Sequence, residues 1–113
     1  SASAELGEEG RRELDKLADL LLDVAERIPE DVDWILRIDG HTDILPINTP
    51  RFPSNWELST ARAVAVVRYL ADQGVPERRM AAAGFGEFFP VAEGTSPEAL
   101  QRNRRIELKL TDR

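Results

Sequence analysis

Two side chains of opposite charge, Asp43 and Arg62, stand where they could bind a ligand. Asp43 opens a long loop after an expected strand, at the end where open α/β sheets place their ligands. Arg62 lies on an expected helix, one turn beyond Leu58 and beside the apolar stripe. If the loop folds back, Arg62 can donate two parallel hydrogen bonds to a carboxylate while Asp43 accepts a hydrogen bond from an ammonium. The two side chains would then bind one small zwitterion. The plainer interpretation is that the two side chains pair with each other or with solvent.

The sequence offers little for nucleophilic catalysis. It contains one histidine, His41, and no cysteine. No Gly-x-Ser-x-Gly elbow surrounds Ser54, Ser59 or Ser96. Disulfides, thiol nucleophiles and cysteine metal sites are therefore excluded, a hydrolytic triad is disfavoured, and neither an enzymatic activity nor a cofactor is expected.

A metal site is the second chemical alternative. Asp39, His41 and Asp43 alternate at the end of the same expected strand, and alternation would place two carboxylates and one imidazole on one face. Such a set is a weak pattern, because all three ligands fall within five residues and no distant fourth ligand accompanies them. We therefore predict no metal.

The charge is unevenly distributed along a chain whose length fits one domain over residues 1–113. The net charge is −6, but residues 1–33 hold 11 acidic and 4 basic side chains, and the remainder is close to neutral. Without clustered Lys and Arg, neither nucleic acid nor an anionic membrane surface is expected as a partner. The longest apolar run, Ala63 to Val67, is far shorter than the roughly 20 residues of a membrane span.

Hydrophobic spacing and helix-capping residues predict an order of α-β-α-β-(short α)-β. The expected elements are a helix over 8–28, a strand over 34–39, a long loop over 41–53, a helix from the capping box Ser54–Glu57 to about 73, a strand over 80–83, a loop over 84–95, a helix over 97–102 and a final strand from 106. Gly40 is expected to break the first strand. In the final strand, Ile106, Leu108 and Leu110 are expected to point inward.

Three phenylalanines gather in the loop over 84–95. Phe85, Phe88 and Phe89 are interpreted as core anchors of this loop rather than as a stacking platform, because no basic groove for nucleic acid runs beside them. The acidic first helix is interpreted as a solvated face. An alternative function is a protein-interaction module that acts through this helix.

Four motifs occur in an order that resembles the OmpA-like peptidoglycan-binding domain. They are His41-Thr42-Asp43, Asn55-x-x-Leu58-Ser59-x-x-Arg62-Ala63, Gly84-Phe85-Gly86-Glu87 with Pro90, and Asn103-Arg104-Arg105-Ile106-Glu107. The resemblance covers about residues 3–110. It is specific because four motifs follow one another over one domain length, whereas any one of them alone would be weak.

The resemblance implies a β/α/β/α/β fold of the α/β (α+β) class, with a mixed sheet and helices packed on one face. It also implies noncovalent binding of the meso-diaminopimelate of the peptidoglycan stem peptide. Asp43 matches the family position that holds the ligand's ammonium, and Arg62 matches the one that holds its carboxylate. Thr42, Asn55 and Leu58 match positions that line the pocket, and Arg104 matches one near its rim.

Two departures from the family pattern are informative. The loop between Asp43 and Asn55 is longer than in the porin and lipoprotein branches and looks more like the flagellar stator B-subunit (MotB-like) branch. At the start, residues 1–6 resemble only the turn after the family's first strand, so that strand is expected to be truncated, leaving an open sheet edge. The resemblance implies a periplasmic domain without direct membrane contact of its own, in a membrane-anchored parent that forms a homodimer.

Overall fold

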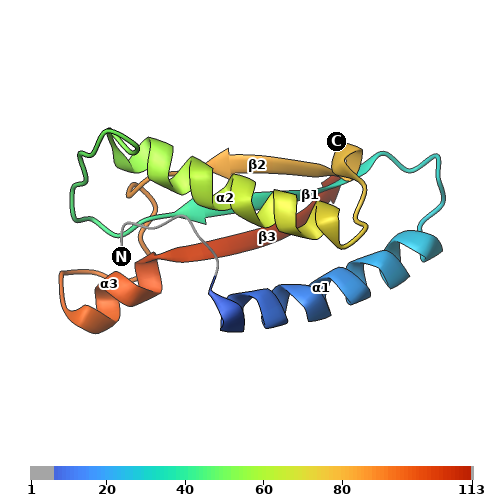
Figure 1. The fold of residues 1–113 in the computed structure, drawn as a ribbon, viewed down its shortest axis with the longest axis horizontal. Helices are drawn as coiled ribbons and strands as arrows, with labels where there is room; N and C mark the ends of the chain where they lie inside the picture. Colours follow the sequence, from blue (N-terminus) through green and yellow to red (C-terminus); the bar gives the residue numbers. More distant parts are fainter. Residues whose placement is uncertain (1–6, 113) are drawn as a thin grey trace.

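The computed structural model describes residues 7–112, which form two layers (Figure 1). The elements are α1 (Glu8–Arg27), β1 (Trp34–His41), α2 (Asn55–Asp72), the short 3-10 helix η1 (Glu77–Arg79), β2 (Met80–Gly84), α3 (Pro97–Asn103) and β3 (Arg105–Asp112). The order of the α-helices and strands is the one that the sequence predicted; η1 was not predicted. The N-cap Ser54 predicted for α2 is confirmed, since its side chain accepts from the Trp56 N–H, and the Ser96 side chain caps α3 by accepting from the Ala99 N–H.

The sheet has the order β2-β1-β3, with β1 central. β1 is parallel to β2, which it reaches through the crossover helix α2, and antiparallel to β3. The predicted mixed sheet is therefore confirmed. Because β3 is antiparallel to β1, and α2 runs back along the sheet towards the parallel strand β2, the C-terminal end of β1, the start of α2 and the start of β3 meet at one end of the molecule (Figure 1).

The core lies between the sheet and the two long helices. Leu36 and Ile38 of β1 pack there against Ala63, Val66 and Leu70 of α2, and all five are at most 3% exposed. From α1 only Ala18 is fully buried, because that helix contacts the core with one edge. The Tyr69 hydroxyl of α2 donates to Asp15 of α1 at 2.5 Å and ties the two helices together.

The prediction that Gly40 breaks the first strand is wrong. β1 continues through Gly40 to His41, and Gly40 pairs in register with Gly84 of β2. A Cβ on Gly40 would lie 2.1 Å from the Ser59 carbonyl oxygen, and one on Gly84 would lie 2.0 Å from the Thr60 Oγ1. Both glycines are therefore needed for the close approach of α2 to the sheet, not for a turn.

The interpretation of the phenylalanines is wrong for two of the three. Phe85 is half-buried, but Phe88 and Phe89 are 56% and 57% exposed. Phe88 contacts Trp56 at the exposed start of α2 and Phe89 contacts Phe85 edge-on, so neither ring reaches the core between helices and sheet.

The prediction that Leu110 belongs to the core is also wrong. It is 52% exposed, and the core extends along β3 only as far as Leu108. Alternation predicted the face of the strand correctly, but it says nothing about how far that face is covered. The expected truncation of the family's first strand concerns residues 1–6, which lie outside the described residues.

Candidate functional site

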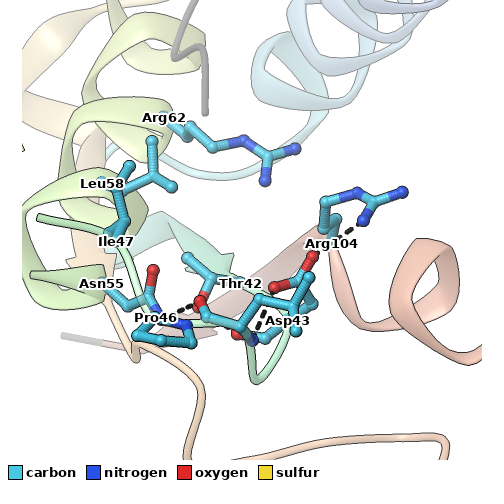
Figure 2. Close-up of a pocket in the computed structure, with 9 residues that line it drawn as sticks. Thr42, Asp43, Pro46, Ile47, Asn55, Leu58, Arg62 and Arg104 are labelled. Carbon is cyan, nitrogen blue, oxygen red and sulfur yellow. Dashed lines mark hydrogen bonds and ion pairs between the residues drawn. The ribbon is translucent and has the colours of Figure 1, made fainter. Parts of the chain in front are cut away.

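A pocket of about 230 Å³ lies at the end of the sheet where β1 ends and α2 begins (Figure 2). Three parts of the chain form it: the loop after β1, the first two turns of α2, and the residue that precedes β3. Its lining residues are Thr42, Asp43, Leu45, Pro46, Ile47, Asn55, Leu58, Arg62 and Arg104. All six residues that the sequence singled out thus lie around one cavity.

α2 contributes one wall of the pocket. Asn55, Leu58 and Arg62 follow each other at spacings of three and four and therefore share one helix face. The Asn55 side-chain amide donates to the Leu45 carbonyl at 3.1 Å and so fixes the long loop against the helix start. Pro46 and Ile47 of this loop lie next to Asn55 and Leu58 and extend that wall of the pocket (Figure 2).

Asp43 is held in place from two sides. Its Oδ2 accepts from Arg104 Nη1 at 2.7 Å, and its Oδ1 accepts from the Leu45 N–H at 2.9 Å. The side chain is only 12% exposed, whereas that of Arg104 is 30% exposed. The plainer interpretation of the sequence, that Asp43 pairs with Arg62, does not describe this structure, because Arg104 takes that place.

Arg62 reaches into the pocket from α2 without a carboxylate partner in the described part of the chain. Within residues 7–112, its one hydrogen bond joins Nη1 to the His41 carbonyl oxygen at 3.4 Å. Burial, reinforced by the nearby charge of Arg104, lowers the pKa of the Arg62 guanidinium below its ordinary value, although Asp43 opposes the shift. A half-buried cation with one long hydrogen bond to a neutral group favours an anion beside it.

The pocket therefore brings two guanidinium groups and one carboxylate together, with apolar walls from Leu58 and Ile47. Arg62 can bind a carboxylate through two parallel N–H donors, and Asp43 retains acceptor capacity for an ammonium. This arrangement of charges is suited to binding a small zwitterion.

The metal alternative is not supported by the geometry. Asp39 is buried on the sheet face away from the helices, where Arg37 pairs with it at 2.7 Å, whereas Asp43 lies in the pocket. No group of three or more His, Asp or Glu side chains among residues 7–112 is arranged to hold a metal ion.

His41 also lies away from the pocket, although its carbonyl oxygen contacts Arg62. Its ring stacks on Phe85, with the centroids 5.0 Å apart and the planes 11° from parallel. Its Nδ1 is buried and has no hydrogen-bond partner among the described residues. Burial, with a contribution from Arg105, lowers the pKa of His41 from its ordinary 6.5, although Glu107 opposes the shift.

Acidification is expected to destabilise the fold through His41. Because the folded-state pKa is lower than 6.5, folding favours the neutral ring: the stabilisation is complete above about pH 6.5 and is lost as the pH falls through the folded-state pKa. Urea unfolding at pH 7.5 and 5.5 should show a larger drop in the free energy of unfolding for the wild type than for His41→Gln, which cannot titrate. Equal drops for the two proteins would contradict this assignment.

Sequence reasoning missed part of the site. It did not predict that Leu45, Pro46 and Ile47 form a wall, nor that Arg104 pairs with Asp43. The prolines at 46, 50 and 53 were a usable signal for an ordered loop. The ion pair had no signal, because its partners stand 61 residues apart.

The described helices include none that is both long and apolar enough to cross a membrane.

The sequence matches the OmpA family over residues 1–104. It is 39% identical over 77 residues to motility protein B of Bacillus subtilis (strain 168), which covers 67% of this chain and 30% of that protein. It is 34% identical over 90 residues to the peptidoglycan-binding protein ArfA of Mycobacterium tuberculosis (strain H37Rv), which covers 80% of this chain and 26% of that protein. The chain thus spans less than a third of these two relatives.

A solved structure, the cell wall anchor of the T6SS from Pseudomonas aeruginosa, has the same fold. It superposes with a TM-score of 0.79 at 38% identity, covering 99% of this chain and 72% of that one. The predicted resemblance is thereby confirmed, and the similarity to motility protein B agrees with the predicted branch. The chain belongs to the OmpA family.

Proposed function

We propose that this domain binds cell-wall peptidoglycan noncovalently, through the meso-diaminopimelate of the stem peptide, and thereby anchors a larger envelope protein to the wall. The names of two similar proteins, a peptidoglycan-binding protein and a cell wall anchor, support the wall as the partner. The observation that carries the proposal is the Arg62 guanidinium, half-buried in the pocket near the carboxylate of Asp43 and without a carboxylate partner among residues 7–112.

The chemistry of the ligand fits these two groups. The free end of diaminopimelate carries an ammonium and a carboxylate on one carbon, so one end of the molecule presents both charges. The ligand's carboxylate would accept two parallel hydrogen bonds from Arg62, and its ammonium would donate to the remaining acceptor positions of Asp43. Arg104 holds the Asp43 side chain oriented before the ligand arrives, which reduces the ordering cost of binding.

Such a site is expected to bind one free stem peptide weakly. A hydrogen bond to a charged group contributes about 1.5–3 kcal/mol net. After the loss of binding entropy, a few such contacts give a dissociation constant on the order of micromolar to millimolar. Weak binding is sufficient here, because a wall presents many stem peptides and a dimeric parent would engage two of them at once.

Titration calorimetry with two matched stem tripeptides tests this proposal. One carries meso-diaminopimelate at its third position, and the other carries lysine, which has the same side-chain ammonium but lacks the second carboxylate. We expect the first tripeptide to bind and the second to bind at least about 30-fold more weakly, because Arg62 then has no anion. Equal binding of both, or of neither, would contradict the proposal.

A further inference from the structure

Two aromatic side chains form an exposed surface beside the pocket. Trp56 of α2 is 49% exposed and Phe88 of the loop after β2 is 56% exposed. Their rings contact each other, with centroids 5.1 Å apart and planes inclined at 30°. We call this pair the aromatic platform. An exposed apolar surface of this kind on a small domain marks an interaction site.

The platform is built on a tightly held turn. Gly86 has a φ of +64°, which favours glycine, and a Cβ there would lie 3.3 Å from the Phe88 ring, so a glycine suits both the turn and the position of the ring. The Gly86 N–H donates to the Ser59 hydroxyl at 3.0 Å, and its carbonyl accepts from the Thr42 N–H at 2.9 Å. The turn is thereby joined to both α2 and the pocket.

The rest of the loop is braced from its other side. The Asn103 side chain accepts from the N–H groups of Val91 and Ala92 and donates to the Ala92 carbonyl, with all three distances between 2.8 and 3.0 Å. Arg105 donates to the Phe89 carbonyl at 2.8 Å. Phe88 is therefore held out to solvent by a fixed loop, and a preorganised ring has a low entropic cost of binding.

We propose that the aromatic platform stacks on a pyranose ring of the glycan strand. A pyranose has apolar C–H faces and a rim of hydroxyls, which matches an aromatic surface with polar groups at its edge. A shallow depression beside the platform supplies those groups: Trp56, Glu57, Thr60 and Ala61 line it, and the exposed Glu57 carboxylate can accept from sugar hydroxyls. The inference rests on the proposed function, because the stem peptide brings the sugar to this surface.

The proposed function brings a sugar within reach of the platform. Trp56 follows the pocket residue Asn55 directly, and Gly86, two residues before Phe88, is hydrogen-bonded to the pocket residue Thr42. In peptidoglycan, two residues join the third position of the stem peptide to a sugar. The bound group is the far end of the diaminopimelate side chain, and two residues and an ether link lead from there to the sugar, so at ~3.5 Å per residue length the reach is roughly 20 Å. The platform lies within that reach, although its depression is on a different face of α2 from Asn55, Leu58 and Arg62.

The two tryptophans allow a direct test that does not depend on the pocket. Trp34 is 6% exposed in the core, whereas Trp56 is on the platform. A trimer of N-acetylglucosamine, which carries no peptide, should shift the indole N–H resonance of Trp56 and leave that of Trp34 unchanged. The same shift is expected in Asp43→Ala, so a failure of the zwitterion site would not conceal the result. No shift of the Trp56 resonance at millimolar trimer would overturn the inference.

A second measurement quantifies the contribution of the platform. The wild type should bind a disaccharide-tripeptide about two- to tenfold more tightly than the tripeptide alone. Trp56→Ala and Phe88→Ala should remove this gain without changing tripeptide affinity. Phe89→Ala is the matched control, because Phe89 is 57% exposed but contacts Phe85 rather than Trp56. If both platform variants still bind the disaccharide-tripeptide more tightly than the tripeptide, by the wild-type factor, the inference is overturned. It is also overturned if the wild type self-associates through Trp56, so that Trp56→Ala abolishes the self-association and the trimer does not compete with it.

Discussion

Replacing Arg62 with alanine is expected to abolish co-sedimentation of the domain with purified sacculi. Within residues 7–112, Arg62 supplies the one guanidinium of the pocket that has no carboxylate partner. Without it, a bound carboxylate would lose two parallel N–H donors. Losing charged hydrogen bonds costs about 2–4 kcal/mol, a factor of roughly 30 to 1,000 in affinity. The fold should survive, because the Arg62 side chain makes one long hydrogen bond and no ion pair among the described residues.

Two further variants make this test specific. Arg62→Lys keeps the charge but not the planar fork, and it should bind more weakly than the wild type. Arg68→Ala removes an exposed arginine from the same helix and should sediment like the wild type. If Arg62→Ala, shown to be folded by circular dichroism, still sediments with sacculi as the wild type does, the role of Arg62 is disproved.

Replacing Gly40 with alanine is expected to destabilise the domain severely. The new Cβ would lie 2.1 Å from the Ser59 carbonyl oxygen and 3.5 Å from Ala63 Cβ, so β1 and α2 must move apart. Backbone atoms cannot rotate away from the clash as a side chain does. We expect a loss of about 3 kcal/mol or more in the free energy of unfolding, and a decrease of more than ~10 °C in Tm.

Gly10→Ala is the matched control for this prediction. Gly10 lies in α1 with no atom within 4 Å of its Cβ position. The same substitution should therefore stabilise the protein there, by up to about 1 kcal/mol, because alanine is the better helix former. Thermal unfolding followed by circular dichroism compares the two. A Gly40→Ala protein as stable as the wild type would show that the helix and strand can separate without cost.

The consequence of Gly40→Ala should extend to ligand binding. Gly40 and Gly84 together let the first turns of α2 approach the end of the sheet. Those turns carry Asn55 and Leu58, with Arg62 one turn further, while β1 leads directly into Thr42 and Asp43. Any separation of helix and strand therefore widens the pocket between its two charged walls.

The elements could be predicted from the sequence because their signals are local. Apolar residues at spacings of three and four predict α1, and the Ser54 cap with Glu57 predicts the start of α2 within one residue. Gly40 was misread because a glycine in a strand pattern has two meanings, a break or a close approach, and the atom that it approaches lies in Ser59, 19 positions away. Phe88 was misread because hydrophobicity does not tell whether a loop has a layer to pack against.

The sequence by itself determined the family, the order of the elements, and the charged residues of the site, because residue types at fixed spacings carry that information. Only the tertiary structure decided which charged side chains of the pocket pair with each other. Asp43 is paired with Arg104, and Arg62 is left with a carbonyl oxygen, because the loop after β1 and the residue before β3 meet beside α2. Tertiary structure also turned Trp56 and Phe88 into one surface. Pairings between residues far apart in the chain depend on how helix and sheet pack, which no local pattern encodes.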